Sequence, residues 1–370
     1  TRSFVEKEML PHEETLESTD TLPPELATSL RKRSMELGLH ACNLPEKIGG
    51  GGLDAVSVML IEKELGRTSL ALAECAHRPL NILAACEDEQ VTQFLEPTLR
   101  GEKRDCIAMT EPGAGSDLRG MKCKAVRDGG YWIINGEKHF ISQAFISDFC
   151  VLFAATGEEK TNKGIKKLIS AFLVDFSDPG VEVAPGYKNV SHRGYTNNIL
   201  RFDNARIPEW RIMGPEGDGF RLVNQWLGPT RLTVAATCVA RAERAFEIAL
   251  NYAATREQFG QKIGKFQGIS FPLADMTTEI KLANLMLLET AWKIDRETVT
   301  PEDCAMTKLY CTEMLARVAD QALQTVGGMG LMEDLPLERI WRDARVERIW
   351  DGTSEIQRHI ISRGLLRPLG

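Results

Sequence analysis

The sequence of 370 residues lacks the features that mark several classes of protein. Its 45 Lys and Arg are scattered and outnumbered by 52 Asp and Glu, so no basic run points to a nucleic-acid partner. Charges interrupt every apolar stretch well before the roughly 18 residues that a membrane-spanning helix needs. The first residues are acidic and do not form an apolar signal region. We therefore expect no nucleic acid and no membrane among its partners.

Paired cysteines and metal-binding motifs are also missing. The nine cysteines form no C-x-x-C pair, and an odd number in a long chain suits a reducing compartment. The six histidines show neither H-E-x-x-H nor a Cys/His cluster with the spacing of metal ligands, so no catalytic metal is expected. These patterns predict a cytoplasmic protein, or a protein of the mitochondrial matrix if the source is eukaryotic.

Hydrophobic periodicity divides the chain into helical and extended parts. A helical period predicts helices over 24–37, 55–65, 70–85 and 88–99. From about Arg104 the period becomes two: Asn135-Gly136 between two alternating runs predicts a hairpin over 131–141, and further strands follow at 168–176, 181–184 and 198–202. After Gly219 the helical period returns in three long segments, typical of an antiparallel bundle. A capping box from Ser354 to Gln357 starts a last helix.

The resulting fold class is α+β, mainly α. We expect an N-terminal α-helical domain over residues 1–104, a central β-barrel or β-sandwich domain over 105–212, and a C-terminal four-helix bundle over 213–370.

Two glycine clusters are candidates for binding loops. Met109 to Asp117 (MTEPGAGSD) follows a strand, and such a loop brings backbone amides close to a flat ring or a phosphate, although a plain turn fits equally. It lacks the Gly-Lys-Ser/Thr of a P-loop and the G-x-S-x-G of a nucleophile elbow. Gly327-Gly328-Met329-Gly330 follows a helix, which favours a helix C-cap over a nicotinamide fingerprint.

Asp351 is the most informative carboxylate. It lies in Ile349-Trp350-Asp351-Gly352-Thr353, directly before a capped helix. One interpretation is an acidic residue that favours a positive helix end. The other is a general base whose aromatic neighbour keeps water away and raises its pKa. Spacing alone does not choose between them.

Seven segments in order resemble the FAD-dependent acyl-CoA dehydrogenase family. They are LPEKIGGGGL, MTEPGAGSD, INGEKHFIS, GPTRLTVAA with RAERAFEIALNYAATREQFG, FQGISFPLADM, QTVGGMG and RDARVERIWDGTSEIQR, and they cover nearly the whole chain. The resemblance implies an oxidoreductase that binds FAD as cofactor. It also implies an acyl-CoA thioester substrate, an electron-transferring flavoprotein as partner, and a homo-oligomer, usually a tetramer.

The same resemblance implies roles for individual residues. Asp351 would be the base, and the N–H of Asp351 or Gly352 would help to bind the thioester carbonyl. Ser116, Thr230, Arg231 and Trp350 would meet the substrate. The residues implied to contact FAD, some of them from a neighbouring subunit, are Met109, Thr110, Ser116, Phe140, Ser142, Arg256, Phe259, Gln267, Gln324, Gly327, Gly328, Thr353 and Glu355.

Departures from the family pattern concern the substrate. Many members carry Glu where this chain has Asp351, and the missing methylene withdraws the carboxylate by roughly 1.5 Å. Branched-chain members place a Glu on the long helix, where this chain has Thr230, which cannot act as a base. The short base favours an acyl group that lies closer, such as a cyclic or α-branched one.

Three further hypotheses stay open at this level. A flavin oxidase resembling nitroalkane oxidase also uses an Asp base on this scaffold. A non-catalytic CoA-thioester-binding relic is a second alternative. His77 and Arg78 could also meet a polar or carboxylated acyl tail.

Overall fold

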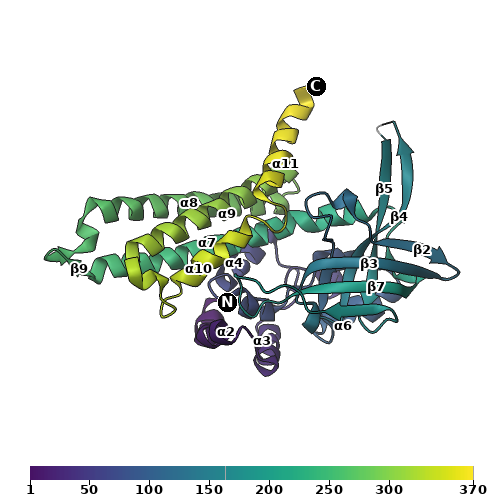
Figure 1. Cartoon of the computed structure of the whole chain (residues 1–370), viewed down its shortest axis with the longest axis horizontal. Helices are drawn as coiled ribbons and strands as arrows, with labels where there is room; N and C mark the ends of the chain where they lie inside the picture. Colours follow the sequence, from purple (N-terminus) through teal and green to yellow (C-terminus); the bar gives the residue numbers. More distant parts are fainter. Residues whose placement is uncertain (163, 370) are drawn as a thin grey trace.

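The computed structural model describes residues 1–162 and 164–369. Helices form the first part of the chain, a β-sheet the middle and long helices the last part (Figure 1). The long helices lie side by side at one end of the molecule, and the sheet forms the other end. This arrangement confirms the predicted mainly α, α+β fold.

The N-terminal part is built from short helices. They are α1 (Arg2–Phe4), α2 (Glu13–Thr19), α3 (Pro24–Glu36), α4 (Ala55–Leu65), α5 (Leu70–Ala73) and α6 (Glu96–Leu99), with a π-helical segment at Val91–Leu95 before α6. The single helix expected over 70–85 is wrong. The chain leaves α5 through a 3₁₀ turn at Glu74–Ala76, and a second 3₁₀ turn starts only at Asn81. Pro79 lies between them, and a proline ring inside a helix removes a hydrogen bond and clashes with the preceding turn.

The middle part is one curved sheet. Its strands are β1 (Asp105–Ala108), β2 (Lys124–Asp128), β3 (Tyr131–Ser142), β4 (Phe149–Thr161), β5 (Gly164–Asp175), β6 (Val181–Ala184), β7 (Asn197–Pro208) and β8 (Ile212–Met213). They are ordered β6-β7-β3-β2-β4-β5-β8, with β1 on β4. One face buries Trp132 against Phe172, with ring centroids 5.3 Å apart.

The hairpin expected at Asn135-Gly136 is wrong. Strand β3 runs straight through these residues, and the pairing with β7 shifts between Ile134 and Gly136 as a β-bulge does. Gly136 has φ +146°, and a Cβ on it would lie 2.7 Å from Cys123. The glycine therefore serves a close strand approach, and the chain reverses instead at Gly129 and Gly130, between β2 and β3.

The C-terminal part is a helical bundle of α7 (Gly219–Thr255), α8 (Gln267–Asp295), α9 (Pro301–Val326), α10 (Leu337–Glu347) and α11 (Ser354–Leu366). Helix α7 buries Ala235, Ala242 and Ala249, whose small side chains allow close helix packing. The β9–β10 turn (Glu257–Gln258 and Gln261–Lys262) lies at the far end of the bundle, and α11 projects from its side (Figure 1). No helix in the described part of the chain is long and apolar enough to cross a membrane.

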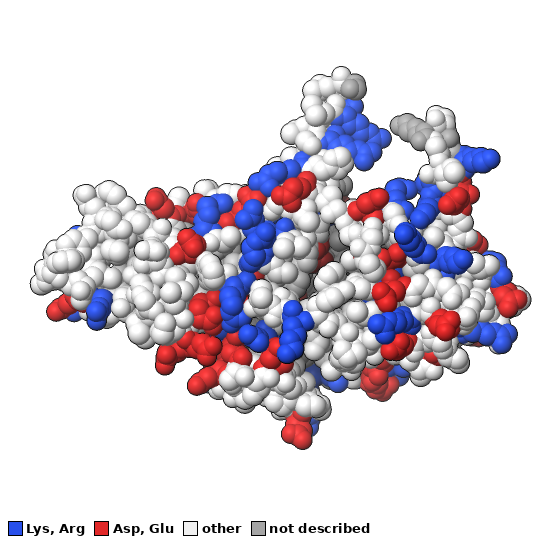
Figure 2. All heavy atoms as spheres, viewed as in Figure 1, with Lys and Arg blue, Asp and Glu red and all other residues white. Residues whose placement is uncertain are grey.

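The start of α11 differs in one detail from the expected capping box. Its N-cap is Thr353, whose Oγ1 accepts the Ile356 N–H at 3.2 Å, whereas the Ser354 hydroxyl has no partner in the described part of the chain. The first turns of α7 pack against the sheet and the N-terminal helices, because Leu222 and Trp226 share a core with Phe94 and Phe149. On the face drawn in Figure 2, acidic and basic side chains are interspersed over the middle of the molecule, and the β9 end carries few of either.

Candidate active site

The loop between α10 and α11 turns on two residues in the left-handed region. Asp351 has φ +50° and Gly352 has φ +92°. A Cβ on Gly352 would lie 2.6 Å from Gln357 Nε2, which donates at 2.8 Å to the Gly352 carbonyl. A left-handed aspartate is uncommon and is kept only where its surroundings determine the turn.

Lys308 is the main support beneath this loop. It lies on α9 with its side chain fully buried. Its Nζ donates to the carbonyls of Glu347 (2.7 Å), Trp350 (2.9 Å) and Gly352 (2.9 Å). An ammonium has three donors, so all of them are used on backbone carbonyls at and beyond the end of α10. Lys308 therefore fixes the course of the chain on both sides of Asp351.

The Asp351 carboxyl is the acidic group on this loop. No hydrogen bond or ion pair within the described residues engages it, although Lys308 and Arg231 carry positive charge nearby. Burial raises its pKa to about 6; Lys308 and Arg231 lower it in part, and Glu347 adds to the rise. Arg231 is itself buried, which lowers its pKa, and its Nε has no hydrogen-bond partner among the described residues. The result is a carboxyl with the proton affinity of a general base.

Two backbone donors beside this carboxyl are also unused. Within the described residues, neither the Asp351 N–H nor the Gly352 N–H has a hydrogen-bond acceptor. A buried backbone donor without a partner is costly, so such a group commonly meets a ligand or water.

The Gly-rich loop follows β1 and is fastened by a buried ion pair. Glu111 accepts from Lys138 Nζ at 2.8 Å and from the N–H groups of Lys122 (2.5 Å) and Cys123 (3.0 Å). Lys138 also donates to the Met109 carbonyl at 2.9 Å, and the Thr110 carbonyl accepts the His139 N–H at 2.8 Å. The half-buried Met109 and Thr110 are thereby fixed.

Farther along this loop the surface is open. Ser116 is exposed, and nothing lies within 4 Å of a Cβ built on Gly113 or Gly115. This is a backbone surface that a flat ligand can approach.

The end of β3 presents an aromatic ring to solvent. Phe140 has φ +56° and is 56% exposed, with its ring 5.2 Å from that of Tyr187. Ser142, the last residue of β3, is half-buried. A large exposed side chain in a strained backbone position is a common sign of a binding role.

The remaining predicted cofactor residues fall into two places. Thr353 and Glu355 start α11, next to Asp351. A second group lies at the far end of the bundle, near β9 (Figure 1), where a groove of about 600 Å³ is lined by Arg256, Gly328 and neighbouring residues of α7 and α9. Phe259 beside it is 94% exposed, and Gln267, Gln324 and Gly327 are exposed.

His77 and Arg78 are not placed to contact a substrate. His77 is buried and paired with Asp105 at 2.8 Å, and Arg78 is paired with Glu62 at 2.5 Å. Both side chains thus have internal partners, and the hypothesis that they meet an acyl tail is wrong.

Thr230 is half-buried on α7 with its hydroxyl donating to the Trp226 carbonyl, whereas Trp350 is half-buried beside Asp351.

Several residues at this site had no place in the sequence-based prediction. Lys308 lies on the apolar face of α9 with Cys304, Cys311 and Leu315, and a lysine at such a position is a signal that pattern reasoning could have used. Glu347 likewise continues the buried face of α10. His192, in the loop between β6 and β7, shows no signal in the sequence.

Family models match almost the whole chain. The models are the acyl-CoA dehydrogenase N-terminal domain over residues 1–102, the middle domain over 106–205 and the C-terminal domain over 217–366.

Curated relatives match over nearly their full length. A probable acyl-CoA dehydrogenase of Bacillus subtilis is 36% identical, covering 99% of this chain and 96% of the relative. A caffeyl-CoA reductase-Etf complex subunit of Acetobacterium woodii is 32% identical with the same coverage.

Solved structures agree with these matches. Butyryl-CoA dehydrogenase from Megasphaera elsdenii superposes with a TM-score of 0.90 at 30% identity, covering 99% of this chain and 96% of that one. An FAD complex of PigA has a TM-score of 0.90 at 29% identity, covering 98% and 95%. The expected family, fold, enzyme class and cofactor are confirmed: the chain belongs to the acyl-CoA dehydrogenase family of FAD-dependent oxidoreductases.

Proposed function

We propose that this enzyme dehydrogenates an acyl-CoA thioester to the 2-enoyl-CoA, with Asp351 as the base that removes the α-proton. The observation that carries this proposal is the half-buried carboxyl of Asp351, which has no partner among the described residues and a pKa raised to about 6. At neutral pH such a group is deprotonated, yet it binds a proton far better than an ordinary aspartate. Neither the nitroalkane-oxidase-like alternative nor a non-catalytic relic is favoured, because the relatives from Bacillus subtilis and Megasphaera elsdenii are named as acyl-CoA dehydrogenases.

Removal of the α-proton requires a place for the developing negative charge. An alkyl carbon beside a thioester is a weak acid, and its ionisation moves charge to the carbonyl oxygen. The free N–H groups of Asp351 and Gly352 are suited to hold that oxygen, since pre-oriented donors are most effective where charge develops. The same short loop then provides both the base and a donor to the oxyanion, which explains why its course is fixed so firmly by Lys308.

The residues around the loop fit the cofactor of the family. The open backbone at Gly113 and Gly115 and the exposed Phe140 ring offer two surfaces for a flat ring system. Met109, Thr110, Ser116 and Ser142 come from the same two segments, and Thr353 with Glu355 opens α11, a helix N-terminus that favours phosphate groups. When FAD is bound it accepts the hydride that leaves the β-carbon.

The far-end residues point to a second subunit. Arg256, Phe259, Gln267, Gln324, Gly327 and Gly328 cluster near β9, away from the loop that carries Asp351 (Figure 1). We infer that they contact the distal part of FAD in a neighbouring subunit of a homotetramer. An exposed aromatic side chain such as Phe259 suits burial in such an interface.

The substrate side of the site favours a compact acyl group. Asp351 is one methylene shorter than glutamate, and Trp350, the residue before it, is half-buried. A cyclic or α-branched acyl group brings its α-carbon nearer the short base. Arg231 lies behind the base, and Thr230 on the same helix cannot replace it.

Electrons would then pass to an electron-transferring flavoprotein. The relative from Acetobacterium woodii is a reductase subunit of a complex with such a protein, which supports this type of partner.

The test is a panel of straight, branched, cyclic and carboxylated acyl-CoAs, scored by anaerobic bleaching of the flavin. We expect rapid bleaching by at least one thioester and slow reoxidation by oxygen. Fast reoxidation by oxygen with no bleaching by any thioester would contradict the proposal. Reduction of the matching enoyl-CoAs by a reduced electron-transferring flavoprotein establishes the direction.

A further inference from the structure

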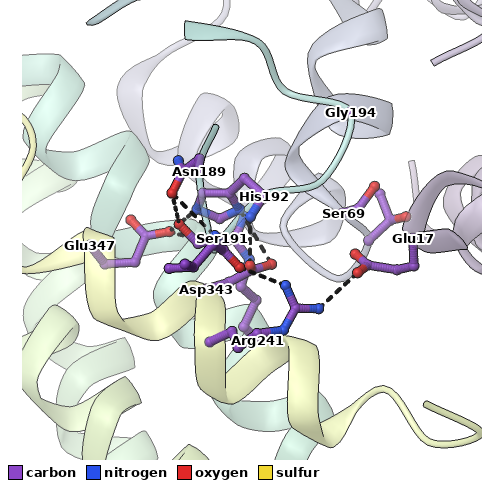
Figure 3. Close-up of polar contacts among 12 residues, drawn as sticks. Glu17, Ser69, Asn189, Ser191, His192, Gly194, Arg241, Asp343 and Glu347 are labelled. Carbon is purple, nitrogen blue, oxygen red and sulfur yellow. Dashed lines mark hydrogen bonds and ion pairs between the residues drawn. The ribbon is translucent and has the colours of Figure 1, made fainter. Parts of the chain in front are cut away.

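A buried polar cluster lies against Trp350, the residue that precedes the base. His192 reaches it from the loop between β6 and β7, and its ring is fully buried. Its Nδ1 is 3.3 Å from Asp343 Oδ2 and its Nε2 is 3.3 Å from Glu347 Oε1. Figure 3 shows the ring between these two carboxylates, which lie one turn apart on α10. The backbone N–H of His192 also donates a hydrogen bond to Asp343 Oδ1 at 2.7 Å.

The contacts of the ring define its charge. Both contacts are at ion-pair distance, and neither ring nitrogen makes an aligned hydrogen bond among the described residues. A neutral imidazole would turn the lone pair of one nitrogen toward a carboxylate, so the two carboxylates together favour the imidazolium. Arg241 on α7 completes the cluster with an ion pair to Glu347. Two carboxylates then face two cations, and the cluster is neutral only while His192 is protonated. Burial opposes this charge, but Asp343 and Glu347 raise the pKa of His192 above its ordinary value.

Trp350 connects this cluster to the base. Its indole stacks on the His192 ring, with centroids 5.1 Å apart and planes within 6° of parallel. Its Nε1 donates to Glu347 Oε2 at 2.8 Å. The indole is thereby held by a cation on its face and a carboxylate at its edge, and the next residue along the chain is Asp351.

We propose that the His192 imidazolium is a positioning residue for the base, acting through the stacked Trp350 and the shared partner Glu347. This inference rests on the proposed role of Asp351. Lys308 holds the backbone of the loop, whereas the cluster holds the side chain that precedes the base and so determines the orientation of Asp351. The strained backbone of Asp351 requires such support from both sides.

The protonation of His192 is set by groups from every element around it. Asp343 and Glu347 face it from α10, Arg241 from α7, and the Tyr195 ring lies 6.4 Å away on its own loop. Loss of the proton at high pH leaves one carboxylate without compensation and weakens the stack. The rate of α-proton removal should therefore fall on the alkaline side as His192 deprotonates.

The test is His192→Gln in the FAD-loaded enzyme, with the exposed His12→Gln as the matched control. We expect kcat to fall by about 100-fold, the size of effect that a base displaced by about 1 Å produces. KM and FAD content should stay within a few-fold of the wild type, and the alkaline limb of the kcat profile should disappear. The double variant His192→Gln/Glu347→Gln, which restores charge balance, should recover part of kcat.

A second measurement does not depend on turnover. Hydrogen–deuterium exchange over residues 346–353 should accelerate in His192→Gln and remain unchanged in His12→Gln. If His192→Gln does not fold, Trp350→Phe keeps the stack but removes the bond to Glu347, and it should lower kcat in the same direction by a smaller factor.

The outcomes separate the two proposals. Wild-type enzyme that dehydrogenates no acyl-CoA defeats the proposed function, while the exchange measurement still reports on His192. A folded His192→Gln enzyme with wild-type kcat, pH profile and exchange over 346–353 overturns the positioning role. A loss of thermal stability with an unchanged pH profile also overturns it, because that pattern shows a purely structural ion pair.

Discussion

Two aspartates near the end of α10 have opposite electrostatic environments. Asp343, on the helix, is buried; its desolvation is outweighed by His192 and Arg241, which lower its pKa to about 2. Asp351 lies just beyond the helix, and burial raises its pKa to about 6. The positive charges of Lys308 and Arg231 lower this pKa only in part. Lys308 uses all three donors on carbonyls, and within the described residues Arg231 forms no hydrogen bond or ion pair with the carboxyl.

The comparison shows how one short segment provides both stability and reactivity. Pairing a buried carboxylate with two cations fixes structure and removes its basicity, and withholding such partners keeps a carboxylate reactive. Dehydrogenation needs an unpaired, reactive carboxylate next to a paired carboxylate that fixes the structure. The charged cluster around Asp343 supports the loop on which the unpaired Asp351 works.

The largest expected effect comes from removing the reactive carboxylate. Asp351→Asn should lower kcat by about 10²–10⁴-fold, the usual contribution of a general base. Its melting temperature should not fall, because a carboxyl with a raised pKa destabilises the folded state at neutral pH. Steady-state kinetics and calorimetry check both, with the exposed Asp334→Asn as control. An unchanged kcat would remove Asp351 from the mechanism.

Removing the support of the loop should affect stability strongly. Lys308→Met leaves three carbonyls without their donor, and a few unsatisfied buried groups cost about 3–5 kcal/mol. Urea unfolding measures the loss, and Lys32→Met, at an exposed lysine, provides the control. A loss below about 1 kcal/mol, within the range of ordinary surface substitutions, would show that Lys308 does not hold the loop.

The pairing of Asp343 should affect how the free energy of unfolding falls at acid pH. Its folded pKa is lowered from 3.8 to about 2, so its contribution is present above the unfolded pKa and is lost as pH falls through that window. We expect the wild type to lose about 2 kcal/mol more than Asp343→Asn between these values. Parallel urea titrations at several pH values give the difference. If the free energy of unfolding fell equally with pH in both proteins, the pairing would be contradicted.

The smallest predicted effect is the pH dependence of the rate. With a pKa of about 6, Asp351 is protonated and inactive as a base below that pH. The rate of flavin reduction at pH 5 should be about tenfold below its plateau, since each unit below the pKa costs about one factor of ten. Stopped-flow bleaching over a pH series measures it. An acid limb centred near 4 would mean an ordinary, solvated aspartate.

The sequence predicted local features well and tertiary ones poorly. The helix at Ala55–Leu65 and the strand at Val181–Ala184 agree with the structure residue for residue, because their periodicity reflects burial on one face. Asn135-Gly136 forms no hairpin turn, since the same dipeptide serves a bulge when a neighbouring strand passes close to the glycine. The 70–85 segment shows that one proline outweighs a run of good helix formers.

In the candidate site too, the local features were predictable from the sequence and the tertiary contacts were not. Motif likeness pointed to the loop before α11, where Asp351 indeed lies. Lys308 and His192 reach that loop from α9 and from the β6–β7 connection, and only the folded chain brings them there. The unusual pKa of Asp351 depends on where the donors of Lys308 point, and no spacing rule contains that information.

The most direct test of Asp351 as the base separates proton removal from oxidation. A thioester that cannot be oxidised, such as a 3-thia-acyl-CoA, is incubated with the FAD-loaded enzyme in D₂O, and deuterium at the α-carbon is followed by NMR. We predict exchange in the wild type that rises through a pKa of about 6 and is lost in Asp351→Asn. Equal exchange rates in the two proteins would contradict the account, because another group would then remove the proton.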